Sequence, residues 1–80
     1  MTSRYMLVTY VKNKSGKWDE VTSFRNNLKM KHYQTATVIL DFKNKQCVVN
    51  KLNREADFDS MLEMYKRLIG DRLTPHLPQS

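Results

Sequence analysis

The chain has 80 residues, a net charge of +6 and one cysteine. This length fits a single small domain, and a lone cysteine excludes an intramolecular disulfide, so we expect a reducing, cytoplasmic setting. No signal-peptide pattern is present, and no apolar run approaches the ~18 residues of a membrane span. The scarcity of Gly, Ala and Pro beside abundant Lys and Asn suggests an AT-rich genome, such as that of a phage or a low-GC bacterium.

The first predicted strand covers Arg4–Asn13 and is apolar on both faces. Alternation places two sets of apolar side chains on opposite sides, namely Tyr5, Leu7 and Val11 on one and Met6, Val8 and Tyr10 on the other. Such a strand is typical of a central position in a sheet, or of a face that a partner covers. The polar stretch Lys14–Lys17 predicts a turn in which Gly16 is free to adopt positive φ.

The segment Trp18–Leu28 is compatible with two structures. On a helix, Trp18, Val21 and Leu28 would share one side. The β-branched Val21 and Thr22, together with the short preceding turn, favour instead a strand over residues 17–24 that forms a hairpin with the first strand. We adopt the strand and keep the helix as the alternative for residues 18–28. The polar and basic residues 25–34 predict a loop or an irregular connection.

Two apolar, β-branched runs flank a short polar break in Thr35–Leu52, which is the pattern of an antiparallel hairpin. A loop with an even number of residues places Phe42 opposite Cys47 and Leu40 opposite Val49. An odd loop would mix the faces, because a slip of one residue inverts every side chain. We therefore predict a loop of about two or four residues.

This register predicts one apolar face for the central hairpin. Its members alternate along the two strands and are Ala36, Val38, Leu40, Phe42, Cys47 and Val49. The opposite face, which includes Ile39 and Asp41, is mixed, and we expect it to be solvated or to meet a partner.

Residues 53–70 predict an amphipathic helix. Its apolar side chains follow the spacing of one helix face and are Phe58, Met61, Leu62, Tyr65, Leu68 and Ile69. Asp57 suits the N-cap, and Gly70 suits the left-handed residue that follows a helix. The apolar helix face is expected to bury against the apolar sheet face, because neither is stable alone in water.

Together these elements predict an α+β fold. It comprises a small antiparallel sheet of about four strands, built as a meander of hairpins, with one C-terminal amphipathic helix packed on one face. The single domain is predicted to cover residues 1–73. Residues 74–80 contain two prolines and no periodic pattern, so they predict a flexible C-terminal tail.

Side chains that could support catalysis or metal binding are sparse. The histidines are His32 and His76, and Cys47 is predicted on the core face, where a cysteine is usually an inert small hydrophobe. No CxxC, HxxxH or clustered carboxylate spacing occurs, and no glycine-rich phosphate loop is present. We therefore predict no enzymatic activity, no cofactor and no metal site.

The basic charge is unevenly distributed along the chain. Residues 1–54 hold eleven Lys and Arg against three acids, whereas residues 55–80 hold three against five. Such asymmetry is typical of a surface that binds a polyanion, although surplus charge also serves solubility. The candidate nucleic-acid-binding residues are Lys12, Lys14, Lys17, Arg25, Lys29, Lys31, Tyr33, Lys43 and Lys45. Exposed Trp18 or Tyr33 could stack on bases, but we expect Trp18 to cover one end of the core.

These observations predict a small, non-enzymatic binding module that contacts DNA or RNA through its basic half. The alternative is a protein-binding adaptor or inhibitor. It would dock on an acidic partner surface or pair strands with a partner, including a second copy of the chain in a homodimer through the sheet. On that alternative, a change of an exposed apolar residue such as Ile39 is expected to weaken binding.

Overall fold

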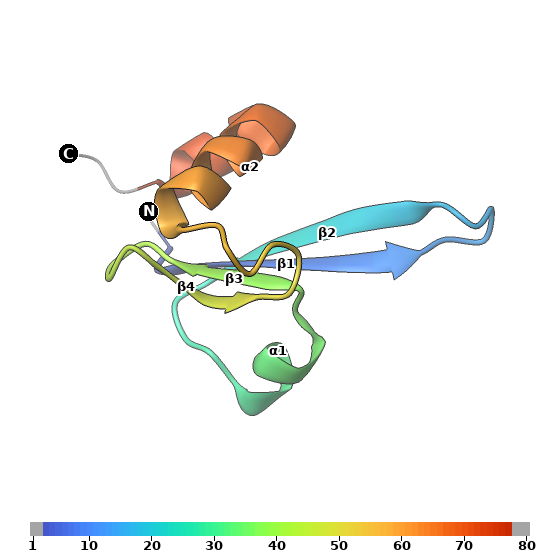
Figure 1. Cartoon of the computed structure of the whole chain (residues 1–80), viewed down its shortest axis with the longest axis horizontal. Coiled ribbons are helices and arrows are strands. Elements are labelled where there is room, and N and C mark those ends of the chain that lie inside the picture. Colours follow the sequence, from blue (N-terminus) through green and yellow to red (C-terminus); the bar gives the residue numbers. More distant parts are fainter. Residues whose placement is uncertain (1–2, 78–80) are drawn as a thin grey trace.

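A computed structural model, which describes residues 3–77, shows a four-stranded antiparallel sheet with helices on both faces (Figure 1). The elements are β1 (Tyr5–Lys12), β2 (Trp18–Arg25), α1 (Met30–Thr35), β3 (Val38–Asp41), β4 (Gln46–Asn50), α2 (Phe58–Leu73) and the 3-10 turn η1 (Thr74–His76). The predicted α+β fold with a C-terminal helix is confirmed. No helix in residues 3–77 is long and apolar enough to cross a membrane.

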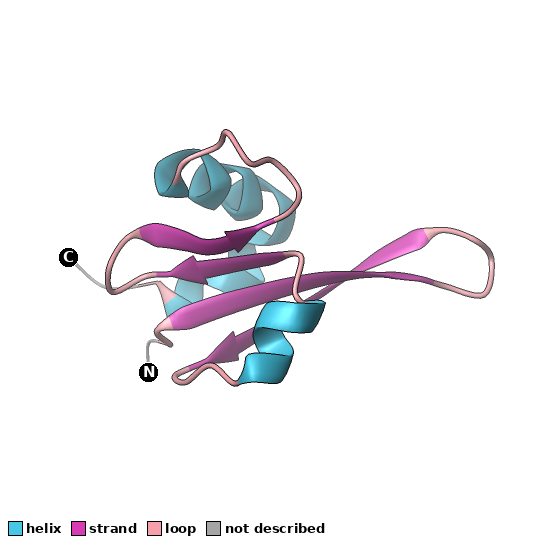
Figure 2. Ribbon diagram, turned by 60° about the horizontal axis from the view of Figure 1, so that its bottom comes forward, coloured by secondary structure: helices cyan, strands magenta, loops and turns pink. Residues whose placement is uncertain are grey.

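The strand order is β2-β1-β3-β4, so the two hairpins join through β1 and β3 (Figure 2). This order differs from a simple meander because residues 26–37 carry the chain from the end of β2 across β1 to the start of β3. The central position that the two apolar faces of β1 indicated is confirmed. The strand β2 is also confirmed, and the helical alternative for this segment is wrong. The turn between β1 and β2 is confirmed as well, and Gly16 in this turn has a φ of 86°.

The main core lies between the sheet and α2. Its buried side chains come from β1, β3, the β3–β4 turn and α2, and they are Met6, Val8, Val38, Leu40, Phe42, Phe58, Met61, Tyr65, Ile69 and Leu73. Truncating any of these would leave a cavity that the fold could fill only in part. The burial of this layer is what positions α2 on the sheet.

A second, smaller core lies on the opposite face of the sheet. Leu7, Ala36 and Ile39 are buried there, with Leu28 and Val48 packed against them. The prediction that Ile39 lies on a solvated face is wrong, because residues 26–37 cover it and leave it 0% exposed. Ala36 was predicted on the same face as Val38 and lies instead in this second core, since the chain bends between them at residue 37.

The β3–β4 turn covers residues 42–45, so its length is even, as predicted. The register is different from the expected one: Leu40 rather than Phe42 faces Cys47. A bulge next to Leu40 then shifts the pairing, so that Ile39 faces Val49. Because a bulge adds one residue to one strand, Cys47 packs toward the main core while Val49 packs on the second core.

Asp41 is 2% exposed, whereas the sequence placed it on the mixed face. It anchors the turn that follows, because its Oδ1 accepts hydrogen bonds from the backbone N–H of Lys43 at 3.0 Å and of Asn44 at 3.3 Å. The turn then closes through Lys45, which adopts a φ of 52°. The side-chain anchor explains why a lysine is held in this left-handed conformation.

Helix α2 begins as predicted, with Asp57 Oδ1 accepting a hydrogen bond from the Ser60 backbone N–H at 2.8 Å. The prediction that the helix ends at Gly70 is wrong. The helix continues to Leu73, which is 0% exposed. Leu68 was predicted on the buried face and is 61% exposed, because it lies at the edge of the apolar stripe, where no other element covers it.

The predicted irregular connection at residues 25–34 contains a short helix, α1. The backbone N–H of Lys29 donates to His32 Nδ1 at 3.1 Å, and the backbone N–H of His32 donates to the Lys29 carbonyl oxygen at 2.9 Å. These local bonds start the helix at Met30. None of its six residues is buried, which is why no apolar periodicity signals it.

The predicted flexible tail covers residues 74–80, and contacts with the rest of the fold continue in it as far as Leu77. The His76 ring stacks on Phe24, with centroids 3.6 Å apart and planes 3° from parallel. Ser3 Oγ and His76 Nδ1 lie 3.1 Å apart, and Leu77 packs against the main core. The packed domain thus extends beyond residue 73, and the rest of the predicted tail, residues 78–80, lies outside the described residues.

Candidate nucleic-acid interface

All nine side chains that the sequence assigned to nucleic-acid binding are exposed. Within residues 3–77, the ion pairs are Arg4–Asp41, Lys66–Glu63 and Arg72–Glu20. None of the predicted cations takes part in them, so their charges are not neutralised by carboxylates of the described chain. Asp41 and Glu20, two of the three acids in the basic half, are held by arginines. This arrangement leaves the lysines available to a polyanion.

The nine residues do not form one surface. The structure divides them among three places: the β1–β2 turn with Lys12, Lys14 and Lys17; the β2–α1 segment with Arg25, Lys29, Lys31 and Tyr33; and the β3–β4 turn with Lys43 and Lys45. Residues 41 and 25 both pair with Tyr5, so the second and third groups lie at the same end of the sheet. The first group lies at the other end of a molecule whose longest dimension is 41 Å.

The first group is carried on a projecting ribbon, which we call the arm. Strand β1 pairs with β3 only over Tyr5–Val8, whereas it pairs with β2 along its full length. Residues 9–12 and 18–21, with the turn between them, therefore extend beyond the rest of the sheet (Figure 1). Helix α2 reaches one face of the arm at Tyr10 and Glu20, whereas Val11, Trp18 and Val21 are exposed.

The turn at the tip of the arm is held by Asn13. Its Oδ1 accepts hydrogen bonds from the backbone N–H of Ser15 and of Lys17, each at 3.0 Å, and from Ser15 Oγ at 2.7 Å. The backbone N–H of Asn13 donates to the Lys17 carbonyl oxygen at 2.7 Å. This network fixes the backbone that carries the three lysines, although their side chains are free to adapt.

Trp18 stands on the arm opposite Lys12, and its side chain is 67% exposed. The expectation that Trp18 covers one end of the core is wrong. Its position beyond the end of β3 explains the exposure, because neither the sheet nor α2 reaches that far. The neighbouring Asp19 carboxylate accepts a hydrogen bond from Asn13 Nδ2 at 3.3 Å.

The second group surrounds an open hollow of about 570 Å³ between the end of β2 and the start of α1. Its lining is rich in cations and amides and consists of Phe24, Arg25, Asn26, Asn27, Lys29, Lys31 and His32. The structure thus brings Arg25, Lys29 and Lys31 together, as their clustering in the sequence indicated. Tyr33, which is 40% exposed, lies outside this lining.

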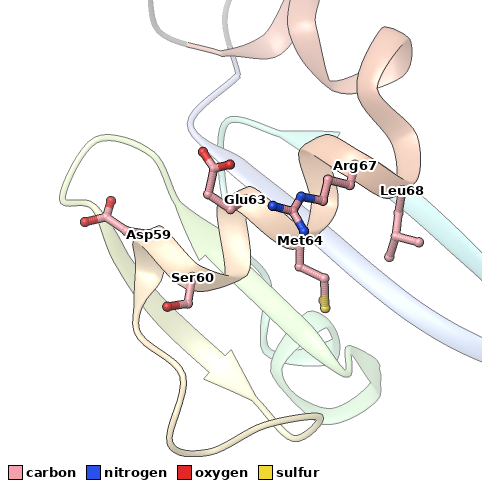
Figure 3. A pocket seen from close by; sticks show the side chains of 6 residues that line it. All are labelled: Asp59, Ser60, Glu63, Met64, Arg67 and Leu68. Carbon is pink, nitrogen blue, oxygen red and sulfur yellow. The ribbon is translucent and has the colours of Figure 1, made fainter.

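A different surface follows the solvent side of α2, where a shallow hollow of about 750 Å³ runs along the helix (Figure 3). Its lining combines acids, apolar groups and one arginine: Asp59, Ser60, Glu63, Met64, Arg67 and Leu68. The carboxylates of Asp59 and Glu63 repel a polyanion. This face therefore serves as a natural comparison surface for the basic groups.

No three His, Cys, Asp or Glu side chains in residues 3–77 are placed to hold a metal ion. Burial raises the pKa of the Cys47 thiol, which favours the unreactive protonated form. The hydroxyls of Tyr10 and Tyr65 lie 3.2 Å apart, and burial raises the pKa of Tyr65 far above its ordinary value.

Comparison of the chain with known protein families, with curated proteins and with solved structures gives no match. Sequence reasoning located the cations but did not find the arm or the exposure of Trp18. No strand-length difference in the sequence indicated either feature, because the first predicted strand and the apolar run that ends at Phe42 are similar in length. The arm arises because β3 pairs with only Tyr5–Val8 of β1, and a long strand beside a short one leaves part of its length unpaired.

Proposed function

We propose that the protein is a small, non-enzymatic module that binds nucleic acid through its exposed lysines and arginines. One observation carries this proposal: the predicted cations are exposed and unpaired with carboxylates in the described chain, while Asp41 and Glu20 are paired to arginines. Cations in this state release counterions from a nucleic acid when they contact its phosphates, which is the main source of sequence-independent affinity. The single Cys47 fits a reducing compartment, so a cytoplasmic location is part of the proposal.

The first test measures binding to labelled single- and double-stranded DNA and RNA at several salt concentrations. We expect affinity that falls steeply with salt. Replacing Lys29 and Lys31 together by Ala should weaken binding to all sequences. It should also reduce the salt slope by about one to two, since each phosphate that a cation neutralises adds about 0.7 to 0.9 to that slope. The absence of binding at low salt would overturn the proposal.

A matched control uses two cations from the other face of the sheet. Lys66 and Arg67 are exposed on α2, and Lys66 Nζ lies 3.5 Å from Glu63 Oε1. Their joint replacement by Ala removes the same formal charge as the Lys29 and Lys31 variant, and we expect it to leave the salt slope unchanged. Equal effects of the two double variants would show that net charge, rather than the basic hollow, determines binding.

A protein partner is the second candidate function, and a specific observation favours it. On the face of the arm opposite Trp18, Val11 is 48% exposed and Val21 is 51% exposed. These residues lie beside the free edge of β2, where a strand of an acidic partner, or of a second copy of the chain, could pair. Ile39 is buried and cannot test this candidate, so Val11→Ser and Val21→Ser replace it. Loss of binding with weak salt dependence is the expected signature.

A further inference from the structure

We infer that Trp18 is a stacking platform for an unpaired base, so that the arm selects single-stranded over double-stranded nucleic acid. This inference rests on the proposed function and makes it more specific. It names one aromatic side chain, its supporting lysines and the class of ligand that they fit.

The position of Trp18 gives its ring no role in the core. Helix α2 makes its outermost described contacts with the hairpin through Tyr10, which reaches Tyr65, and through Glu20, which lies 3.5 Å from Arg72. Trp18 lies two residues beyond Glu20 toward the tip and on the same face of the hairpin. The largest apolar side chain of the chain is thus 67% exposed to solvent among the described residues 3–77.

The arm holds the backbone that carries this ring in a defined place. Trp18 is the first residue of β2 and follows directly on Lys17, whose backbone N–H and carbonyl oxygen are both bonded to Asn13. A backbone fixed in this way lowers the entropy cost of ordering the ring on a ligand. Stacking on a base then requires little rearrangement.

The charge around the ring fits a polynucleotide strand. Lys12 faces Trp18 across the hairpin, Lys17 precedes it, and Lys14 lies in the same turn. The nearest acid in the sequence is Asp19, and its Oδ1 accepts a hydrogen bond from Asn13 Nδ2. An aromatic face bordered by free cations is the arrangement by which proteins bind single strands, with the ring contacting a base and the cations contacting phosphates.

The same geometry disfavours a duplex. In a double helix both faces of each internal base are covered by neighbouring bases, so a protein ring reaches them only after unstacking. A single strand offers its bases without this cost. Stacking on an aromatic side chain strengthens binding by about 5- to 140-fold per base, which sets the size of the preference we expect.

The chain supplies its own probe for the test, since Trp18 is its single tryptophan. Titration with an unlabelled single-stranded oligonucleotide of about 20 nucleotides should quench its fluorescence, because a stacked base covers the ring. A duplex of the same sequence should bind more weakly and quench less. In parallel, anisotropy of a labelled single strand measures binding whether or not Trp18 takes part.

Variants separate the inference from the proposed function. Trp18→Ala should weaken single-strand binding by about 5- to 140-fold and leave duplex binding unchanged, while Trp18→Phe should retain part of the affinity. Leu68→Ala, which truncates an exposed apolar side chain on α2, is the matched control and should bind as the parent chain does. Because Trp18 is exposed, circular dichroism should show that all three variants fold.

Each outcome decides something. Binding by anisotropy with unquenched fluorescence and an unchanged Trp18→Ala variant would overturn the inference and leave the proposed function standing. An equal loss of duplex and single-strand binding in Trp18→Ala would also overturn it. No binding to either form at low salt would overturn both the inference and the proposed function.

Discussion

Arg4 and Asp41 form a bidentate ion pair on the face of the sheet that carries the second core: Arg4 Nη2 lies 3.2 Å from Asp41 Oδ2, and Arg4 Nε lies 3.3 Å from Oδ1. The guanidinium also lies 4.8 Å above the Tyr5 ring centre. The pair ties the residue that precedes β1 to the last residue of β3. Burial alone would raise the pKa of Asp41, but hydrogen bonds from Arg4 and from the turn backbone outweigh it and lower this pKa below its usual value.

We predict that Asp41→Asn lowers the free energy of unfolding by about 1–3 kcal/mol at neutral pH, because the charged hydrogen bonds from Arg4 are removed. A depressed folded-state pKa stabilises the protein above the unfolded-state pKa of about 3.9, and this stabilisation disappears as the pH falls through the folded-state pKa. The difference between parent and variant should therefore shrink below about pH 4. Urea unfolding from pH 2 to pH 7 measures it. The exposed Glu55→Gln serves as a control, and a difference independent of pH would contradict the prediction.

Gly70→Ala is expected to stabilise the protein by about 0.5–1 kcal/mol. Gly70 lies inside α2, and a Cβ atom added there meets no atom within 4 Å. Alanine loses less backbone entropy than glycine on entering a helix. Gly16→Ala is the matched comparison and should destabilise by about 1–2 kcal/mol, since Gly16 has a φ of 86°. Thermal melts of both variants test the pair, and a lower melting temperature for Gly70→Ala would contradict it.

Leu73→Ala should destabilise the protein by about 2–5 kcal/mol, because Leu73 is 0% exposed and its truncation leaves a cavity under the last turn of α2. Leu68→Ala, five residues earlier on the exposed side of α2, should change stability by less than about 0.5 kcal/mol. Since a domain of this size has a stability on the order of 5 kcal/mol, Leu73→Ala could unfold outright. The milder Leu73→Met, expected to cost under about 1.5 kcal/mol, keeps the comparison measurable by urea unfolding. Similar losses of stability for Leu73→Ala and Leu68→Ala would contradict the burial of Leu73 at the end of α2.

The fold was predictable where local patterns repeat over several residues. The alternation in β1, the spacing of apolar residues in α2 and its Asp57 cap each identified their element correctly. The predictions that were wrong concern features that depend on contacts between residues distant in the sequence. Asp41 is buried because Arg4, 37 residues earlier, reaches it, and α2 passes Gly70 because burial of Leu73 outweighs the ~1 kcal/mol that a helical glycine costs.

The candidate interface shows the same division. The exposure of the lysines followed from their chemistry, and the grouping of Lys29 with Lys31 followed from their proximity in the sequence. Their separation from Lys12 followed from the first hairpin, whose turn and open end lie at opposite ends of the sheet. The position of Lys43 and Lys45 did not follow, because β3 pairs with β1 rather than with β2, and this places the β3–β4 turn at the end away from Lys12. The exposure of Trp18 has the same origin, since the short β3 leaves the end of the hairpin uncovered.

The hydrogen bond between Ser3 and His76 joins residues 73 positions apart. Both lie at the end of the sheet away from the arm (Figure 1 shows that end near the start of β1), because Ser3 comes shortly before β1 and His76 stacks on Phe24 near the end of β2. A bead, dye or carrier protein joined to the chain before Ser3 or after His76 therefore connects to the fold at the end away from Trp18. For the same reason, two copies can be joined in tandem by a short flexible linker with both arms free. Such a pair would raise the local concentration of the second arm once the first has bound, which turns a weak contact into a strong one without any new side chain.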